Sequence, residues 1–138
     1  MPVRILALDH GEARVGAAVC DPTETIASPT GVLGPDPAEV VRLAATTDAE
    51  MVVVGLPVTL SGEEGPQAQS ARAYAAELEK LLEIPVETYD ERLTTRMASS
   101  SARAGAGAPS DALAAAHLLE SFLQRRAGPP REGLAGDD

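Results

Sequence analysis

Five short segments of the chain carry the apolar and β-branched residues typical of buried strands. Each is bounded by glycine, proline or charged residues, which commonly end a strand. The third contains Pro29 and suits the edge of a sheet, because proline has no N–H to donate to a neighbouring strand. The predicted strands are residues 3–8, 14–20, 25–33, 50–57 and 85–89.

Apolar residues also recur at three- and four-residue steps, the period typical of a helix packed on a sheet. The clearest helix is predicted over 66–83, where the stripe consists of Ala68, Ala71, Ala75, Leu78 and Leu82. The other predicted helices begin near Pro37, cover 94–103, and run from Asp111 to about Arg126 with Ser110 as N-cap.

The order of these elements predicts the fold class. The short segment DHGEA between the first two strands predicts an antiparallel hairpin. Later strands alternate with helices, which favours parallel pairing and a three-layer α/β domain. We expect this domain to occupy residues 1–126, and residues 127–138 to form a disordered tail.

Composition narrows the possible functions. The chain has 138 residues, of which 44% are hydrophobic but only 2% aromatic, so Val, Leu, Ile and Ala must build its core. The net charge of −10 argues against a generic nucleic-acid coat protein, but not against an enzyme that uses a local basic patch and metal ions. With one cysteine, no secretory signal and no run long enough to span a membrane, we expect a cytoplasmic protein without a membrane partner.

Acidic residues stand at three places of interest. They are Asp9 at the end of the first strand, Asp90 and Glu91 after the fifth, and Asp111 at the start of the last helix. Functional groups in open α/β sheets gather beyond the carboxyl ends of the strands, so these acids can meet at one edge. On an ideal helix Asp111 lies on the apolar face, whereas His117 falls on another side and is not expected to be its partner.

Clustered carboxylates repel one another unless a cation compensates their charge. Hard divalent ions such as Mg²⁺ prefer oxygen ligands, and two ions about 4 Å apart can activate water and stabilise the leaving oxygen in phosphodiester cleavage. The acids therefore suggest a metal site. Simpler roles stay open: Asp111 can interact with its helix dipole, and Asp9 can be a hairpin residue. Asp90 and Glu91 can belong to a polar surface turn.

Four ordered motifs, within about residues 3–124, carry a family resemblance. They are LALDHGEARVGAAVCDP, VVVGLPVTLSGEEGPQAQSARAYAAEL, PVETYDERLTT and SDALAAAHLLESFL. Together they resemble the YqgF family, small bacterial proteins described as Holliday-junction resolvases and as nucleases that trim precursor 16S ribosomal RNA. The resemblance implies a ribonuclease H-like fold: a five-stranded mixed sheet with its second strand antiparallel to the rest and helices on both faces.

The resemblance also implies roles for the acids. Asp9, Glu91 and Asp111 match the family's catalytic, metal-binding positions, with Asp90 as an alternative ligand, and the implied cofactor is Mg²⁺ or Mn²⁺. Relative to RuvC resolvases, the fourth strand ends in GLP where those enzymes place a glutamate. The segment AGAGAPS before the last helix also lacks the basic residues of many YqgF members. The remaining candidates for substrate binding are Arg14, Arg92, Arg96, Thr94 and Thr95.

The leading hypothesis is therefore a metal-dependent nuclease acting on structured nucleic acid, with precursor 16S rRNA favoured and branched DNA as the alternative. A resolvase acting on a two-fold junction needs a dimer, whereas a ribonuclease can be a monomer or a homodimer. Two other classes remain: a nucleotide-binding protein, whose phosphate loop resembles LDHGEARVG, and a non-catalytic nucleic-acid-binding module of the same fold. Metal-dependent cleavage that is lost on Asp9→Asn would separate the nuclease from both.

Overall fold

A five-stranded mixed sheet forms the centre of the structure, a computed structural model that describes residues 4–11, 13–21, 26–58, 61–93 and 110–127. Its strands are β1 (Ile5–His10), β2 (Val15–Cys20), β3 (Ala27–Leu33), β4 (Met51–Leu56) and β5 (Val86–Asp90). Their order in the sheet is β3-β2-β1-β4-β5. Strand β2 is antiparallel to both of its neighbours, while β1, β4 and β5 pair in parallel. This is the sheet that the family resemblance implied.

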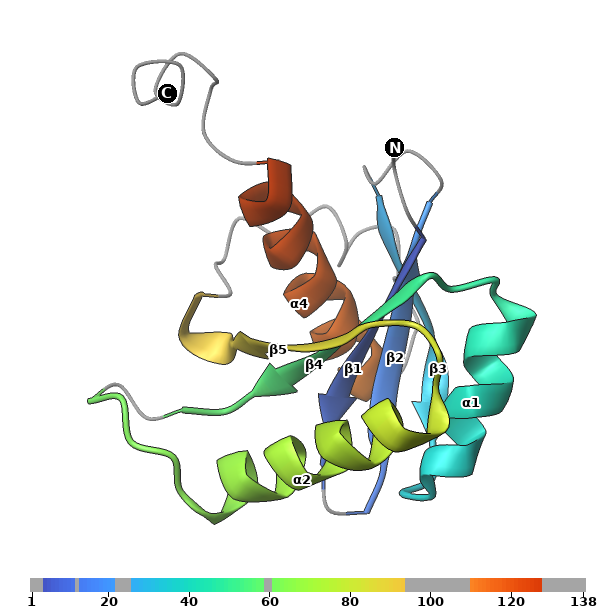
Figure 1. Ribbon diagram of the computed structural model, residues 1–138. Helices are drawn as coiled ribbons and strands as arrows, with labels where there is room; N and C mark the ends of the chain where they lie inside the picture. The colour runs from blue at the N-terminus through green and yellow to red at the C-terminus, as the bar shows by residue number, and fades with distance from the viewer. Residues whose placement is uncertain (1–3, 12, 22–25, 59–60, 94–109, 128–138) are drawn as a thin grey trace, which may run out of the picture.

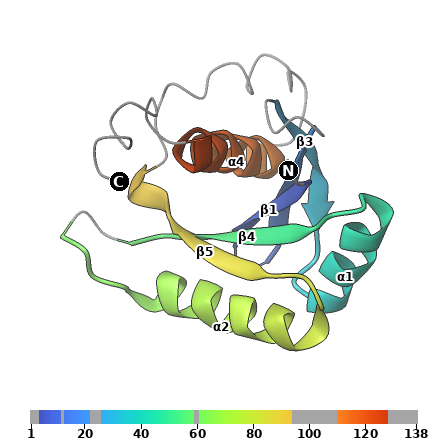
Figure 2. The same ribbon diagram turned by 45° about the horizontal axis from the view of Figure 1, so that its top comes forward.

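Helices cover both faces of the sheet (Figures 1 and 2). The helices α1 (Pro37–Thr46) and α2 (Pro66–Leu81) lie on one face, and α4 (Ser110–Ala127) lies on the other. A short 3-10 turn, η1 (Glu91–Leu93), follows β5. The predicted three-layer α/β architecture is confirmed, and among the described residues no helix is long and apolar enough to cross a membrane.

Alternation along β1 builds two hydrophobic cores, one on each face. Leu6 and Leu8 pack with residues of α1 and α2, whereas Ile5 and Ala7 pack with residues of α4. Because successive side chains of a strand point to opposite faces, residue 9 faces α4 and residue 10 faces α2. The pattern that builds the cores thus also decides on which side the first acid stands.

Helix α4 approaches the sheet closely because small residues line the contact. Three alanines of α4, Ala112, Ala115 and Ala116, are fully buried. At Gly16 of β2, a Cβ atom would lie 1.9 Å from the backbone oxygen of Asp111, so only glycine leaves room for the first turn of α4. Small residues on both sides of the contact therefore let α4 pack close to β2.

Several predicted boundaries shift by one or two residues. Strand β1 continues through His10 and β5 through Asp90, while α4 begins at Ser110 and ends at Ala127. The alternative in which Asp9 belongs to the turn of the hairpin is wrong, because Asp9 pairs with Gly16 within strands β1 and β2. The predicted helix over 94–103 and nearly all of the predicted tail lie outside the described residues.

Candidate active site

The first acid, Asp9, stands near the carboxyl end of the central strand. It faces α4, while the next residue, His10, turns to the opposite face and stacks against Tyr74 of α2, with ring centroids 4.5 Å apart. Burial raises the pKa of Asp9, and the negative charge of Asp111 raises it further. A hydrogen bond from Glu91 acts in the opposite sense by stabilising the Asp9 carboxylate.

The second acid, Glu91, reaches Asp9 across the end of β4. Glu91 opens the η1 turn after β5, and its carboxylate lies above Gly55, where an added Cβ atom would be 2.6 Å from Glu91 Oε2. Gly55 belongs to the GLP segment, the strand end at which the resemblance to RuvC places a glutamate. The Glu91 carboxylate, from the η1 turn, therefore occupies space that the missing side chain of Gly55 leaves open on β4.

Asp9 and Glu91 behave as one acid pair. Burial, followed by repulsion from Asp9, raises the pKa of Glu91 from its ordinary value of 4.5 to about 7. In its protonated form Glu91 donates a hydrogen bond to the Asp9 carboxylate. A bound cation would remove the need for that proton, because it stabilises both carboxylates in their charged forms.

The third acid, Asp111, lies in the first turn of α4 beside Gly16. Its Oδ2 forms an ion pair with Nε of Arg14 at 2.7 Å. The two side chains are 37% and 67% exposed, respectively, and an ion pair this exposed contributes only about 0–1 kcal/mol to stability. Asp111 is thus fixed in position by backbone packing but held by Arg14 only weakly.

Three cavities lined by described residues adjoin Asp9. One of about 120 Å³ reaches Glu91 and the start of α2. A second, of about 190 Å³, lies between Asp9, Glu91 and α4. A third, of about 340 Å³, contains Arg14 and Asp111. Asp9 therefore stands where all three meet, which makes this edge of the sheet the candidate active site.

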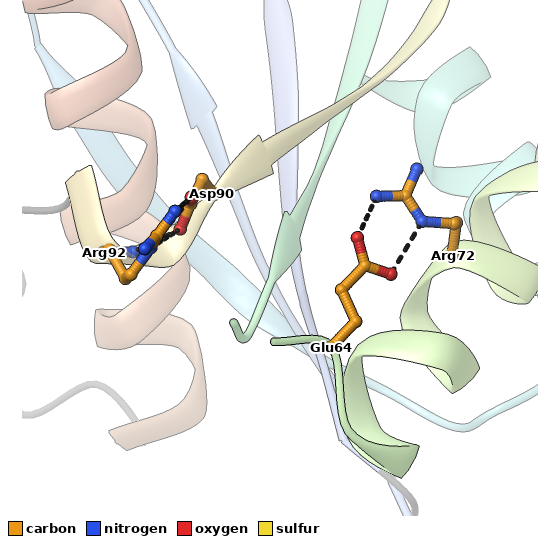
Figure 3. Close-up of polar contacts among 4 residues, drawn as sticks. All are labelled: Glu64, Arg72, Asp90 and Arg92. Atoms are coloured by element: carbon orange, nitrogen blue, oxygen red, sulfur yellow. Dashed lines mark hydrogen bonds and ion pairs between the residues drawn. The ribbon is translucent and has the colours of Figure 1, made fainter. Parts of the chain in front are cut away.

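The candidate alternative ligand, Asp90, is engaged elsewhere (Figure 3). Its carboxylate accepts hydrogen bonds from the Arg92 guanidinium, at 2.7 Å from Nη2 and 3.0 Å from Nε, and from the Arg92 backbone N–H. These bonds lower the pKa of Asp90. Of the two adjacent acids, Glu91 is the one whose carboxylate meets Asp9, which makes Glu91 the better candidate for a metal ligand.

Of the predicted substrate-binding residues, the structure describes two. Arg14 pairs with Asp111, and Arg92 pairs with Asp90. Both basic groups therefore lie beside the acids, at the same edge of the sheet. The other three candidates, Thr94, Thr95 and Arg96, lie outside the described residues.

The loop after β4 is anchored near the site by an ion pair. Glu64 forms an isolated bridge with Val58 and accepts two hydrogen bonds from Arg72 of α2, one of them 3.0 Å from Nε (Figure 3). This fixes the entry to α2 beside Pro57, which lines the smallest of the three cavities. Glu64 is thereby committed to Arg72 and takes no part in the acid pair.

Sequence reasoning missed three residues that shape the site. Gly16 and Gly55 give room to Asp111 and Glu91, and His117 lines the cavity that Asp9 and Glu91 also line. The Nε2 atom of His117 is buried and has no hydrogen-bond partner among the described residues. On the helix, His117 lies on a different side from Asp111. Its nearness to Asp9 and Glu91 depends on how α4 packs on the sheet, and the sequence does not show this.

The donor set suits a hard divalent cation. All three side chains offer carboxylate oxygens, which Mg²⁺ and Mn²⁺ prefer, and the raised pKa values of Asp9 and Glu91 reflect burial and repulsion that a cation offsets. Within the described residues, however, no three His, Cys, Asp or Glu side chains stand together as a ready-made metal cluster. Two acids touch, and the third is directed to Arg14 in the adjoining cavity.

The sheet order, the antiparallel second strand and the acids at the end of the central strand define a protein of ribonuclease H-like, RuvC-type fold. RuvC of T. thermophilus in complex with a Holliday junction substrate has this fold, with a TM-score of 0.61 and 17% identity, over 91% of this chain and 97% of that chain. A second Thermus thermophilus RuvC structure gives a TM-score of 0.54 at 18% identity, over 91% of this chain and 96% of that one.

Sequence comparison identifies the family. Residues 3–125 match the family described as RuvX: Holliday junction resolvase, so the chain belongs to it, and the predicted YqgF family is confirmed. A Chloroflexus aurantiacus relative named "Putative pre-16S rRNA nuclease" is 40% identical over 139 residues, covering 92% of this chain and 91% of the relative. An Anaeromyxobacter dehalogenans relative of the same name is 40% identical over 136 residues, covering 91% of this chain and 99% of the relative.

Proposed function

We propose that this protein is a divalent-metal-dependent nuclease that cleaves phosphodiester bonds in precursor 16S rRNA, in the cytoplasm, during ribosome biogenesis. The observation that carries the proposal is the contact between Asp9 and Glu91, a hydrogen-bonded acid pair at the carboxyl end of the central strand. Membership of the RuvX family and the names of its relatives favour a nuclease and this RNA.

Asp9, Glu91 and Asp111 would hold Mg²⁺ or Mn²⁺, which when bound supplies an activated water and stabilises the leaving oxygen. In the chain itself, Glu91 holds the proton of the acid pair and Asp9 accepts its hydrogen bond. Partial burial beside α4 keeps this pair in a medium of low polarity, where charge interactions are stronger than in water. Arg14 and Arg92 lie at the same edge, where a phosphate backbone would approach.

The adjacent acids Asp90 and Glu91 provide a matched test. Glu91→Gln removes a carboxylate that meets Asp9, whereas Asp90→Asn removes one that pairs with Arg92. We expect Glu91→Gln to lower the cleavage rate of a precursor 16S rRNA fragment in Mg²⁺ or Mn²⁺ by at least about 100-fold, the typical effect of losing one group that stabilises transition-state charge. Asp90→Asn should lower it by less than about tenfold.

The assay also distinguishes the other classes. Cleavage that needs no divalent ion, or that survives Asp9→Asn, would contradict the site assignment. RNA binding without cleavage in any metal would indicate a non-catalytic module. Tight ATP binding in place of RNA binding would indicate a nucleotide-binding protein.

A branched-DNA resolvase is the second candidate, because the family description names that activity. A four-way DNA junction, compared with the rRNA fragment at equal concentration, decides between them by the ratio of kcat/KM values. Paired, symmetric cuts also require two active sites related by a two-fold axis. Sedimentation of the protein with and without the junction would therefore show a dimer for the resolvase.

A further inference from the structure

Arg14 and Asp111 form an ion pair between the start of β2 and the first turn of α4. The Gly11 N–H donates to the Arg14 carbonyl oxygen at 2.9 Å, and this closes the turn between β1 and β2. Two residues later, Gly16 contacts the first turn of α4, which fixes Asp111 above β2. The guanidinium and the carboxylate are therefore brought together by the backbone, in the cavity that Asp9 also lines.

The Asp111 carboxylate interacts with two groups, the Arg14 guanidinium and the Asp9 carboxylate. Nε of Arg14 lies 2.7 Å from Oδ2 of Asp111, at the distance of a strong charge-assisted hydrogen bond. Asp111 also raises the pKa of Asp9 through its charge, so its carboxylate lies within electrostatic reach of the acid pair. A divalent cation shared with Asp9 would draw on the same carboxylate that Arg14 now neutralises.

We propose that Arg14 is a positioning residue that sets the affinity of the site for divalent metal, by competing with the metal for Asp111. This inference rests on the proposed metal site. The exposure of the pair, 67% for Arg14 and 37% for Asp111, makes the exchange feasible, because neither group is enclosed and the guanidinium can turn into solvent. Once released, Arg14 remains at the edge where it can contact a substrate phosphate.

The test is a double-mutant cycle on Mn²⁺ binding. The affinity of each variant is measured by isothermal titration calorimetry of the full chain without nucleic acid. We expect Arg14→Ala to bind Mn²⁺ about two- to fivefold more tightly than the wild type, the fold-change that corresponds to an exposed ion pair. In the Asp111→Asn background the same substitution should change the affinity little, because the carboxylate for which the two cations compete is gone.

Two further variants control for general charge. Arg72→Ala removes an arginine from a similar exposed ion pair, with Glu64, and should leave the Mn²⁺ affinity unchanged. Arg14→Lys retains a cation and should restore much of the competition. Circular dichroism of every variant verifies that the fold is kept.

The outcomes separate this inference from the proposed function. Tightening by Arg14→Ala that is equally large with Asp111→Asn, or weaker binding by Arg14→Ala, overturns the role of Arg14 and leaves the metal site standing. Absence of Mn²⁺ binding by the wild type, or binding that Asp9→Asn does not weaken, overturns the metal site itself and the inference with it.

Discussion

The hydrogen bond between Asp9 and Glu91 makes the acid pair sensitive to pH, because Glu91 must be protonated to donate it. Burial and repulsion disfavour the doubly charged state, so the folded protein retains a proton that an exposed glutamate would lose. The consequence is that the two carboxylates repel each other more strongly above neutral pH, when both are charged. This property belongs to the residue scale, because it depends on two side chains and their immediate surroundings.

The stability of the protein should fall as the pH rises through the pKa of this pair. Because the pKa of Glu91 is raised from 4.5 to about 7, its contribution to stability is fully present below pH 4.5 and is lost as the pH passes 7. The raised pKa of Asp9 acts in the same sense. Thermal unfolding in EDTA between pH 4.5 and pH 8 measures the effect.

Glu91→Gln should flatten this dependence, because an amide does not titrate. The control is Glu77→Gln, an exposed glutamate of α2 outside the acid pair, which should leave the dependence as it is in the wild type. A Glu91→Gln profile that falls as steeply as the wild-type profile would show that other groups hold the proton.

At the scale of elements, the glycines decide where the acids meet. Gly55→Ala would place a methyl group 2.6 Å from Glu91 Oε2 and 3.1 Å from Leu118. The nearer contact is the end of a flexible side chain, so we expect the Glu91 carboxylate to move away from Asp9 at a cost of less than about 2 kcal/mol in unfolding free energy. Cleavage should fall at least about tenfold, measured beside urea unfolding of the same sample.

Gly16→Ala should instead disturb the fold, because its added methyl group meets backbone and not the end of a side chain. The added methyl group would lie 1.9 Å from the Asp111 backbone oxygen, and no rotation of a side chain relieves a contact with backbone. Helix α4 must shift, so we expect a loss of about 1–3 kcal/mol in unfolding free energy. Gly65→Ala, where an added Cβ meets nothing within 4 Å, should cost less than about 1 kcal/mol and serves as the control.

The elements themselves could be predicted because their signals are local. The β-branched run at 51–56 predicts a buried strand, and the alanine stripe of α2 predicts a helix. Both elements are found within two residues of their predicted ends. The positions of Asp9 and Asp111 followed from the elements that carry them. The family motifs then supplied the mixed sheet, which the structural similarity to RuvC confirms.

What could not be predicted depends on distances between elements. Asp90 and Glu91 are adjacent in the sequence, and only the η1 turn directs one carboxylate to Asp9 and the other to Arg92. The clearance at Gly16 likewise exists only when α4 lies on β2. A glycine in a strand gives no indication in the sequence of which side chain will use the space above it.

At the scale of the whole molecule, the three acids come from distant parts of the chain. Asp9 comes from the central strand, Glu91 from the turn after an edge strand, and Asp111 from the helix that covers one face. With a net charge of −10, the chain gains little from general attraction to nucleic acid. Divalent ions at this edge would therefore serve both the chemistry and the approach of a phosphate backbone.

Because these proposed ligands belong to separate elements, metal binding should stabilise the fold as a unit. A ligand that binds only the folded state adds about 2.7 kcal/mol to the unfolding free energy at a concentration of 100 times its Kd. We therefore expect Mg²⁺ or Mn²⁺ to raise the Tm, and to raise it more at pH 8 than at pH 6. The difference arises because Glu91, with its pKa of about 7, must lose its proton to bind the ion.

Asp9→Asn should abolish this metal-dependent rise in Tm, whereas Glu77→Gln should retain it. A rise of equal size in both variants would place the bound ions elsewhere on this acidic surface. A rise in the wild type that is larger at pH 6 than at pH 8 would mean that the ions bind without displacing the proton of Glu91. The acid pair would then stabilise itself through its hydrogen bond, and the link between metal binding and the joining of β1, β5 and α4 would be lost.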